Sequence, residues 1–149
     1  AKVFLVATAN DVTSLPPELL RKGRFDEMFF VDLPDAHDRE EIITMYLRKL
    51  NYDVPPDLLR QLVELSDGFT GSDIEAVTRE LSIAQYHSGG MPAESDIRLH
   101  FTNLVPFSRT NAEELALTRA WGLTRCVPAG TPNRQGGGEP GGIRRVVLL

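Results

Sequence analysis

The stretch that decides the fold runs from residue 3 to residue 35 and reads VFLVATANDVTSLPPELLRKGRFDEMFFVDLPD. It opens with a continuous apolar run, Val3 to Ala7, in which no polar residue alternates. Such a run is typical of a strand buried on both faces of a parallel sheet. A second apolar run, Met28 to Leu33, predicts another core strand. Because two strands cannot hold a sheet alone, we expect the remaining strands of this α/β sheet to precede Ala1.

From Pro34 onward the apolar spacing becomes that of amphipathic helices. Proline, glycine and capping residues mark the ends of the predicted helices. We expect helices over residues 38–50, 56–67, 72–88, 93–104 and 111–125. In the first of these, one apolar stripe is predicted to consist of Ile42, Met45, Tyr46 and Leu50. In the third, Ser72 to Glu75 matches a capping box, which predicts that Ser72 caps the helix.

The sequence therefore predicts an α/β part followed by an all-α part. Residues 1–34 would form the C-terminal part of the α/β core and residues 35–90 a helical domain. Residues 91–127 would add C-terminal helices that pack on the helical domain. Residues 128–149 are rich in Gly and Pro and predict a flexible tail, whose final stretch, 143–149, is short and β-prone.

Composition narrows the class of protein. The chain has 149 residues, 42% hydrophobic and 25% charged, which is the range of globular proteins. No apolar run has the length of a membrane span. The net charge of −5 argues weakly against non-specific nucleic-acid binding. Cys126 is the only cysteine, which rules out an internal disulfide and argues against a zinc site. Without a signal peptide, an intracellular, cytoplasmic location is expected.

Polar side chains at the end of the first strand form a candidate site. Asn10 follows the strand, and strand ends in open α/β sheets are where ligands bind. An Asx turn that closes the strand is the alternative role. Arg21 and Arg24 are three residues apart and would point the same way on a helical turn, which suits a phosphate. The alternative for the arginines is a solvated surface or pairing with the nearby acidic residues.

These segments together resemble the second half of the AAA ATPase core domain, in the FtsH- and NSF-like clade. That family reads apolar strand, Ala-Thr-Asn, a loop, Leu-Arg-x-Gly-Arg-Phe-Asp, strand and Pro-Asp. The corresponding segments of this chain are Ala7-Thr8-Ala9-Asn10, residues 20–26 (LRKGRFD) and Pro34-Asp35. The likeness extends from Lys2 to about Pro128 and is greatest to bacterial and plastid AAA ATPases of uncertain substrate. It implies a P-loop AAA core sheet followed by a helical lid.

The resemblance also implies roles for the polar residues. Asn10 matches sensor 1, which helps to place the attacking water near the γ-phosphate. Arg21 and Arg24 match the arginine fingers, which act in trans on the nucleotide of the neighbouring subunit. A finger donated in trans implies a homo-oligomer, usually a hexameric ring in this family.

In the helical part the resemblance implies a nucleotide contact. The lid motif Gly-Ser/Ala-Asp-Ile/Leu appears as Gly71-Ser72-Asp73-Ile74, whose glycine lets the backbone pass close to adenine and ribose. Ile42 and Tyr46 match positions that border the base, although relatives often have His at the second position. Ordinary helix packing for Ile42 and Tyr46, and a simple capping turn for the motif, remain the alternatives.

The chain contains no Gly-x-x-x-x-Gly-Lys-Ser/Thr loop and no strand that ends in paired acidic residues. We therefore expect the chain alone to be inactive and the intact parent to hydrolyse ATP, with the Mg²⁺ ligands upstream. The family's usual task implies a macromolecular substrate, by default a protein, with nucleic acid left open. Two alternatives lack catalysis: an adaptor or assembly module derived from an AAA protein, and an interaction domain with relic motifs. A P-loop upstream of Ala1 would separate the ATPase from both.

Overall fold

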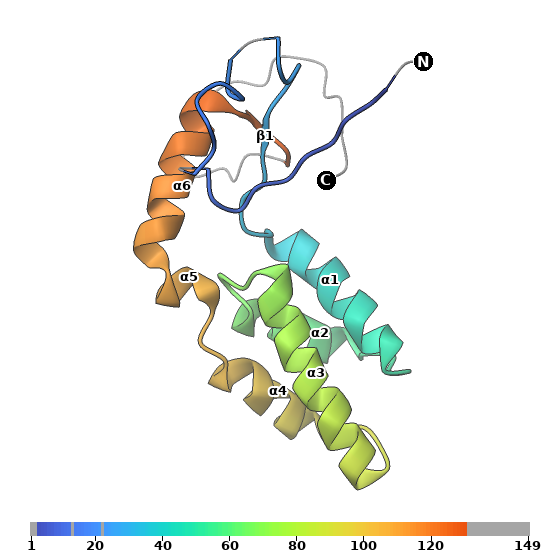
Figure 1. Ribbon diagram of the computed structural model, residues 1–149. Helices are drawn as coiled ribbons and strands as arrows, with labels where there is room; N and C mark the ends of the chain where they lie inside the picture. The colour runs from blue at the N-terminus through green and yellow to red at the C-terminus, as the bar shows by residue number, and fades with distance from the viewer. Residues whose placement is uncertain (1–2, 13, 22, 131–149) are drawn as a thin grey trace. The chain divides into compact units, whose positions relative to one another are not determined.

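The computed structural model describes residues 3–12, 14–21 and 23–130. The described part is mostly helical, with one two-stranded parallel sheet (Figure 1). In chain order the elements are β1 (Phe29–Phe30), α1 (Ala36–Lys49), α2 (Pro56–Leu65), α3 (Gly71–Ser88), α4 (Glu94–Asn103), α5 (Phe107–Thr110), α6 (Ala112–Arg125) and β2 (Val127–Pro128). They belong to two compact units. Among the described residues, the first combines residues up to 32 with residues 113–130, and the second, here called the helical unit, is residues 33–112.

The five predicted helices are present, with ends within a few residues of those expected. Pro56 opens α2, and Gly89 ends α3 with a left-handed backbone (φ 74°). The predicted domain boundaries at residues 34, 90 and 127 remain predictions. Helix α4 packs against α2 and α3 within the helical unit, whereas α6 falls in the first unit.

One apolar core holds the helical unit together. Its buried side chains come from α1 to α4 and from the turn before α3, and are Ile43, Leu47, Leu58, Leu62, Phe69, Ile74, Val77, Leu81, Ile97 and Phe101. The predicted stripe of α1 was displaced by one residue. Ile43 and Leu47 lie at its centre, Ile42 and Tyr46 flank it, and Met45 is exposed. Ile42 and Ile43, like Tyr46 and Leu47, are successive residues and lie 100° apart around the helix axis. Both pairs are apolar, so the sequence alone did not show which member of each pair faces the centre of the core.

The predicted strand over residues 3–7 does not form in the structure. This segment has no regular secondary structure, and Val3, Phe4, Leu5 and Val6 are 88%, 81%, 71% and 47% exposed. A strand is defined by its hydrogen-bonded neighbour, and within the described residues no strand pairs with this segment.

The second predicted strand is present in shortened form and has an unexpected partner. Strand β1 pairs in parallel with β2, with Phe29 opposite Val127 and Phe30 opposite Pro128. Residues 127 and 128 therefore close a sheet at the point where the tail was expected to begin. The later tail positions, 131–149, including the β-prone stretch 143–149, lie outside the described residues.

Helix α6 packs against the segment around β1 and forms hydrogen bonds with it, within the first unit. A Cβ placed on Gly122 would lie 2.4 Å from the Phe30 ring, so only glycine permits this approach. The guanidinium of Arg119 donates from Nε to both carboxylate oxygens of Asp32, at 2.8 and 3.1 Å. Among the described residues no helix combines the length and apolar character needed to cross a membrane.

Candidate nucleotide site

The predicted site residues fall into two groups, one in each unit. Asn10, Arg21 and Arg24 belong to the first unit. Ile42, Tyr46, Gly71 and Ser72 belong to the helical unit. The roles of all seven remain predictions.

In the first unit, Asn10 is exposed and lies at a bend directly after residues 3–9, which have no regular secondary structure. The arginines follow a turn that begins at the prolines, where the amide of Leu19 donates to the carbonyl of Pro16 at 2.9 Å. The side-chain amide of Asn10 and the turn that carries the arginines are therefore accessible to solvent and to a ligand.

Arg21 and Arg24 are joined by one further turn. The amide of Arg24 donates to the carbonyl of Arg21 at 3.2 Å, and Gly23 between them has a left-handed backbone (φ 90°). Both side chains are exposed. Arg21 pairs with Glu18 at 3.4 Å rather than with the acidic residues that follow it, and among the described residues Arg24 makes no ion pair. An exposed pair of this kind contributes little to stability, so both guanidinium groups are available for an anion.

In the helical unit, α3 begins at Gly71, and Thr70 is its N-cap. The hydroxyl of Thr70 accepts from the amide of Asp73, and the carboxylate of Asp73 accepts from the amide of Thr70. The prediction that Ser72 caps this helix was therefore wrong, because the capping box begins two residues earlier. Ser72 lies in the first turn of α3 with an exposed side chain.

Asp73 has a structural role beyond the capping box. Its Oδ2 accepts hydrogen bonds from the Thr70 amide (2.8 Å), the Thr70 hydroxyl (2.9 Å) and the amide of Phe107 (3.2 Å). The third bond joins the start of α3 to the start of α5. Within the Gly-Ser-Asp motif, the Oδ2 atom of the aspartate therefore already has its hydrogen-bond donors within the helical unit and is not available to a ligand.

Nothing in the described structure requires a glycine at position 71, and the same holds for Gly90 and Gly130. A Cβ at Gly71 would meet no atom within 4 Å, and its φ is not left-handed. By contrast, Gly68 has φ 77°, and a Cβ there would lie 2.6 Å from the hydroxyl oxygen of Ser108. The fold explains Gly68. The fold leaves open space beside Gly71, which is large enough for a ligand to approach the backbone closely.

Tyr46 and Ile42 lie on α1, which packs against α3. Ile42 is partly buried against the apolar core, as is Tyr46. Burial raises the pKa of Tyr46 above 10.0, and the nearby Glu75 carboxylate raises this pKa further. Glu75 is one helical turn beyond Gly71 on α3, so Tyr46 is held beside the first turns of that helix. The ammonium of Lys49 lies 4.5 Å from the centre of the Tyr46 ring.

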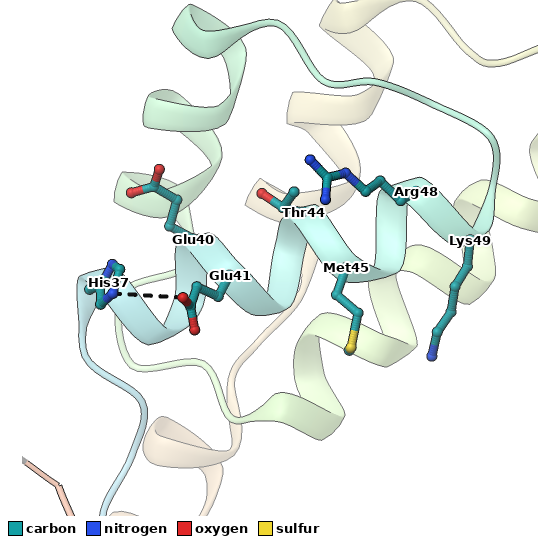
Figure 2. A pocket seen from close by; sticks show the side chains of 7 residues that line it. All are labelled: His37, Glu40, Glu41, Thr44, Met45, Arg48 and Lys49. Carbon is teal, nitrogen blue, oxygen red and sulfur yellow. Dashed lines mark ion pairs between the residues drawn. The ribbon is translucent and has the colours of Figure 1, made fainter.

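A shallow hollow of about 680 Å³ also lies on α1, but none of the predicted site residues lines it. Figure 2 shows its side chains in two rows along this one helix. One row contains His37, Glu41, Met45 and Lys49, and the other contains Glu40, Thr44 and Arg48. His37 and Glu41 approach to 3.8 Å. A hollow between the exposed side chains of one helix offers no converging groups, so we do not assign the nucleotide to it.

Sequence reasoning overlooked the buried Arg39 of α1, whose side chain bonds to the backbone of two other segments. An arginine in an acidic first turn carries no signal of burial in the sequence. The described residues contain no group of three or more His, Cys, Asp or Glu side chains placed to hold a metal ion.

Comparison with known proteins gives the family. No protein-family model matches the chain. It is 37% identical over 127 residues, 81% of its length, to an uncharacterised AAA domain-containing protein, ycf46, of Pyropia yezoensis. It is 33% identical over 113 residues, 76% of its length, to a proteasome-activating nucleotidase of Saccharolobus islandicus. Over 84 residues it is 39% identical to cell division control protein 48 homolog B of Arabidopsis thaliana.

The chain belongs to the AAA family. Within this family it spans about a quarter of the length of its relatives, 25% of the algal protein and 28% of the nucleotidase. Because the match covers 81% of the chain, it necessarily spans the helical unit, residues 33–112.

Proposed function

We propose that this chain is the C-terminal part of an AAA ATPase that couples ATP binding and hydrolysis to the remodelling of a macromolecular substrate. The observation that carries the proposal is the relationship to AAA proteins over four fifths of the chain. Two local features support it. Arg21 and Arg24 are exposed, and the single ion pair that Arg21 makes with Glu18 is weak enough for an anion to replace. The fold of the helical unit does not itself require Gly71.

In this proposal each residue group has a defined task. Asn10 orients the attacking water through its amide, which both donates and accepts hydrogen bonds. Arg21 and Arg24 stabilise the charge that develops on the γ-phosphate of a neighbouring subunit. Ile42 and Tyr46 border the adenine, while Gly71 and Ser72 give the ligand access to the first turn of α3.

The nucleotide would be ATP with Mg²⁺. The chain has no P-loop, so the cradle for the phosphates and the ligands of Mg²⁺ must come from other residues of the same polypeptide. Fingers that act in trans require an oligomer, and we propose a homo-oligomeric, hexameric ring. The substrate would be a protein, and the location cytoplasmic.

The test is a substitution of Arg24 in the full-length, assembled ATPase. We expect Arg24→Ala to lower ATP turnover on the order of a thousandfold while leaving ATP affinity nearly unchanged, because the finger stabilises the transition state of the neighbouring site. Phosphate release and nucleotide titration measure the two quantities, and size-exclusion chromatography with light scattering confirms assembly.

Arg60→Ala is the matched control, because Arg60 is another exposed arginine, on α2, with a single intrahelical partner, Asp57. It should leave turnover unchanged. Turnover by assembled Arg24→Ala protein within tenfold of the unsubstituted enzyme would contradict the finger assignment. A full-length protein with no P-loop and no ATP binding would instead support an adaptor module.

A further inference from the structure

Arg39 is a buried cation in the first turn of α1. Only 7% of the residue is exposed, and its guanidinium contacts three parts of the helical unit. Nη1 donates to the carbonyl of Pro34 at 3.0 Å, and Nη2 donates to the carbonyl of Val63 at 3.3 Å. Nη2 also lies 3.5 Å from Oδ1 of Asp67. One side chain therefore joins the segment before α1 to the last turn of α2 and to the turn that follows.

The last turn of α2 is suited to receive this cation. The final carbonyls of a helix have no intrahelical partners and carry partial negative charge. Helix α2 has no basic residue in its own last turn. The carbonyl of Val63 accepts from the Ser66 hydroxyl (3.1 Å) as well as from Arg39. Arg39 thus supplies from α1 the positive charge that α2 lacks.

Stability alone does not account for an arginine at this position. Its Nε is buried and has no hydrogen-bond partner within the described residues, and a buried donor without a partner lowers the stability of the fold. Its carboxylate partner, Asp67, is 89% exposed and therefore strongly screened. Apolar side chains of similar volume often stabilise a protein as well as a buried charge does. They cannot hold two backbone carbonyls from different segments at once.

We infer that Arg39 is a positioning residue that makes residues 34–38 and the C-terminal end of α2 move as one body. Any bending of the backbone where the chain enters the helical unit is then confined to residues before Pro34. The division of the chain into units, which falls between Asp32 and Leu33, agrees with this location. Resting on the proposed function, the inference has a consequence for nucleotide binding. Ile42 and Tyr46, on the same helix, keep their position relative to α2 and α3 when the chain bends.

Hydrogen exchange on the chain itself tests the inference without nucleotide. We expect Arg39→Met to accelerate amide exchange in segments 35–40 and 62–68 at least tenfold more than in α3. Leu81→Ala, a core substitution in α3, is the control, compared at the denaturant concentration that gives equal global stability. It should show no such selective change in the two segments. Uniform acceleration in Arg39→Met would overturn the inference.

A measurement on the unsubstituted chain covers the case in which Arg39→Met fails to fold. Two carbonyl acceptors should restrict rotation of the Arg39 guanidinium, so its Nη protons should give separate, slowly exchanging NMR signals. A single averaged signal, as expected of an exposed arginine such as Arg60, would overturn the inference.

The consequence for the ATPase is tested in the full-length protein. Arg39→Lys keeps the charge but loses the planar fork that reaches both carbonyls. We expect it to weaken ATP binding about three- to tenfold through lost preorganisation, whereas Leu81→Ala at matched stability has no such effect. Unchanged ATP affinity in Arg39→Lys would overturn this consequence. If the unsubstituted protein binds no ATP, the proposed function fails, while the exchange and NMR experiments still decide the role of Arg39.

Discussion

Neighbouring residues of one motif can have opposite relations to the fold, as Gly71 and Asp73 do. One carboxylate oxygen of Asp73, Oδ2, accepts three hydrogen bonds from its own unit, so capping and packing give this residue a structural role. Gly71 has open space beside it and an ordinary backbone, so the fold explains nothing about it. A residue that the fold does not require is the better candidate for a ligand contact.

Tyr46 gives a prediction at the same scale. Burial, followed by the Glu75 carboxylate, holds its pKa above 10.0 in the folded chain. We expect Glu75→Gln to lower this pKa, because the substitution removes the negative charge while keeping the side-chain shape. Titration of the tyrosine Cζ signal by NMR measures the change, with Tyr86, which is exposed, as the internal reference.

The sign of the pH effect on stability follows from the raised pKa. A folded-state pKa above the unfolded value of 10.0 stabilises the fold fully below pH 10, and the contribution is lost as pH rises through the folded pKa. Stability in chemical denaturation should therefore fall more steeply above pH 10 in the unsubstituted chain than in Glu75→Gln. Identical slopes and an unshifted Tyr46 signal would show that Glu75 does not act on this hydroxyl.

At the scale of elements, the start of α3 shows how a correct helix can have a misassigned cap. Ser72-Asp73-Ile74-Glu75 has the composition of a capping box, but so does the overlapping Thr70-Gly71-Ser72-Asp73. The structure selects the second, because Thr70 follows the turn that carries Gly68 and the buried Phe69. The position of Phe69 in the core fixes where the helix begins.

The two candidate caps give a paired prediction. Thr70→Ala should lower the free energy of unfolding of the helical unit by about 1 kcal/mol, because it removes the N-cap acceptor. Ser72→Ala should change it by less than about 0.5 kcal/mol, because Ser72 is exposed within the helix. Thermal unfolding followed by circular dichroism compares the two. Equal losses, or a larger loss for Ser72→Ala, would contradict the assigned cap.

For the whole molecule, the two units are built from the chain in different ways. The helical unit is one continuous segment, residues 33–112, with its own apolar core. The first unit combines two segments that are distant in sequence, joined by β1 and β2, by Gly122 against Phe30, and by Arg119 with Asp32. A continuous unit can fold from local contacts, whereas a discontinuous one requires closure over the intervening chain.

This difference predicts that a peptide of residues 33–112 folds without the rest of the chain. We expect a helical circular dichroism spectrum and a cooperative thermal transition, because the ten buried apolar side chains of the core all lie within it. Leu62→Ala, which removes a fully buried side chain of that core, should lower its stability by about 2–5 kcal/mol. A broad, non-cooperative loss of helicity would mean that the unit depends on other residues.

The sequence by itself determined the family and five of the six described helices with their approximate ends, because periodicity, helix-ending residues and the Leu-Arg-Lys-Gly-Arg-Phe-Asp motif are local. The short helix α5 was not predicted. Tertiary structure decided the features that depend on partners distant in the chain. Pairing selected β2 as the neighbour of β1, and packing selected Ile43 and Leu47 as the centre of α1. The distant carbonyl of Val63, together with the nearby carbonyl of Pro34, accounts for the buried Arg39. No local pattern encodes these, because hydrogen bonding and burial are set by whatever the fold brings into contact.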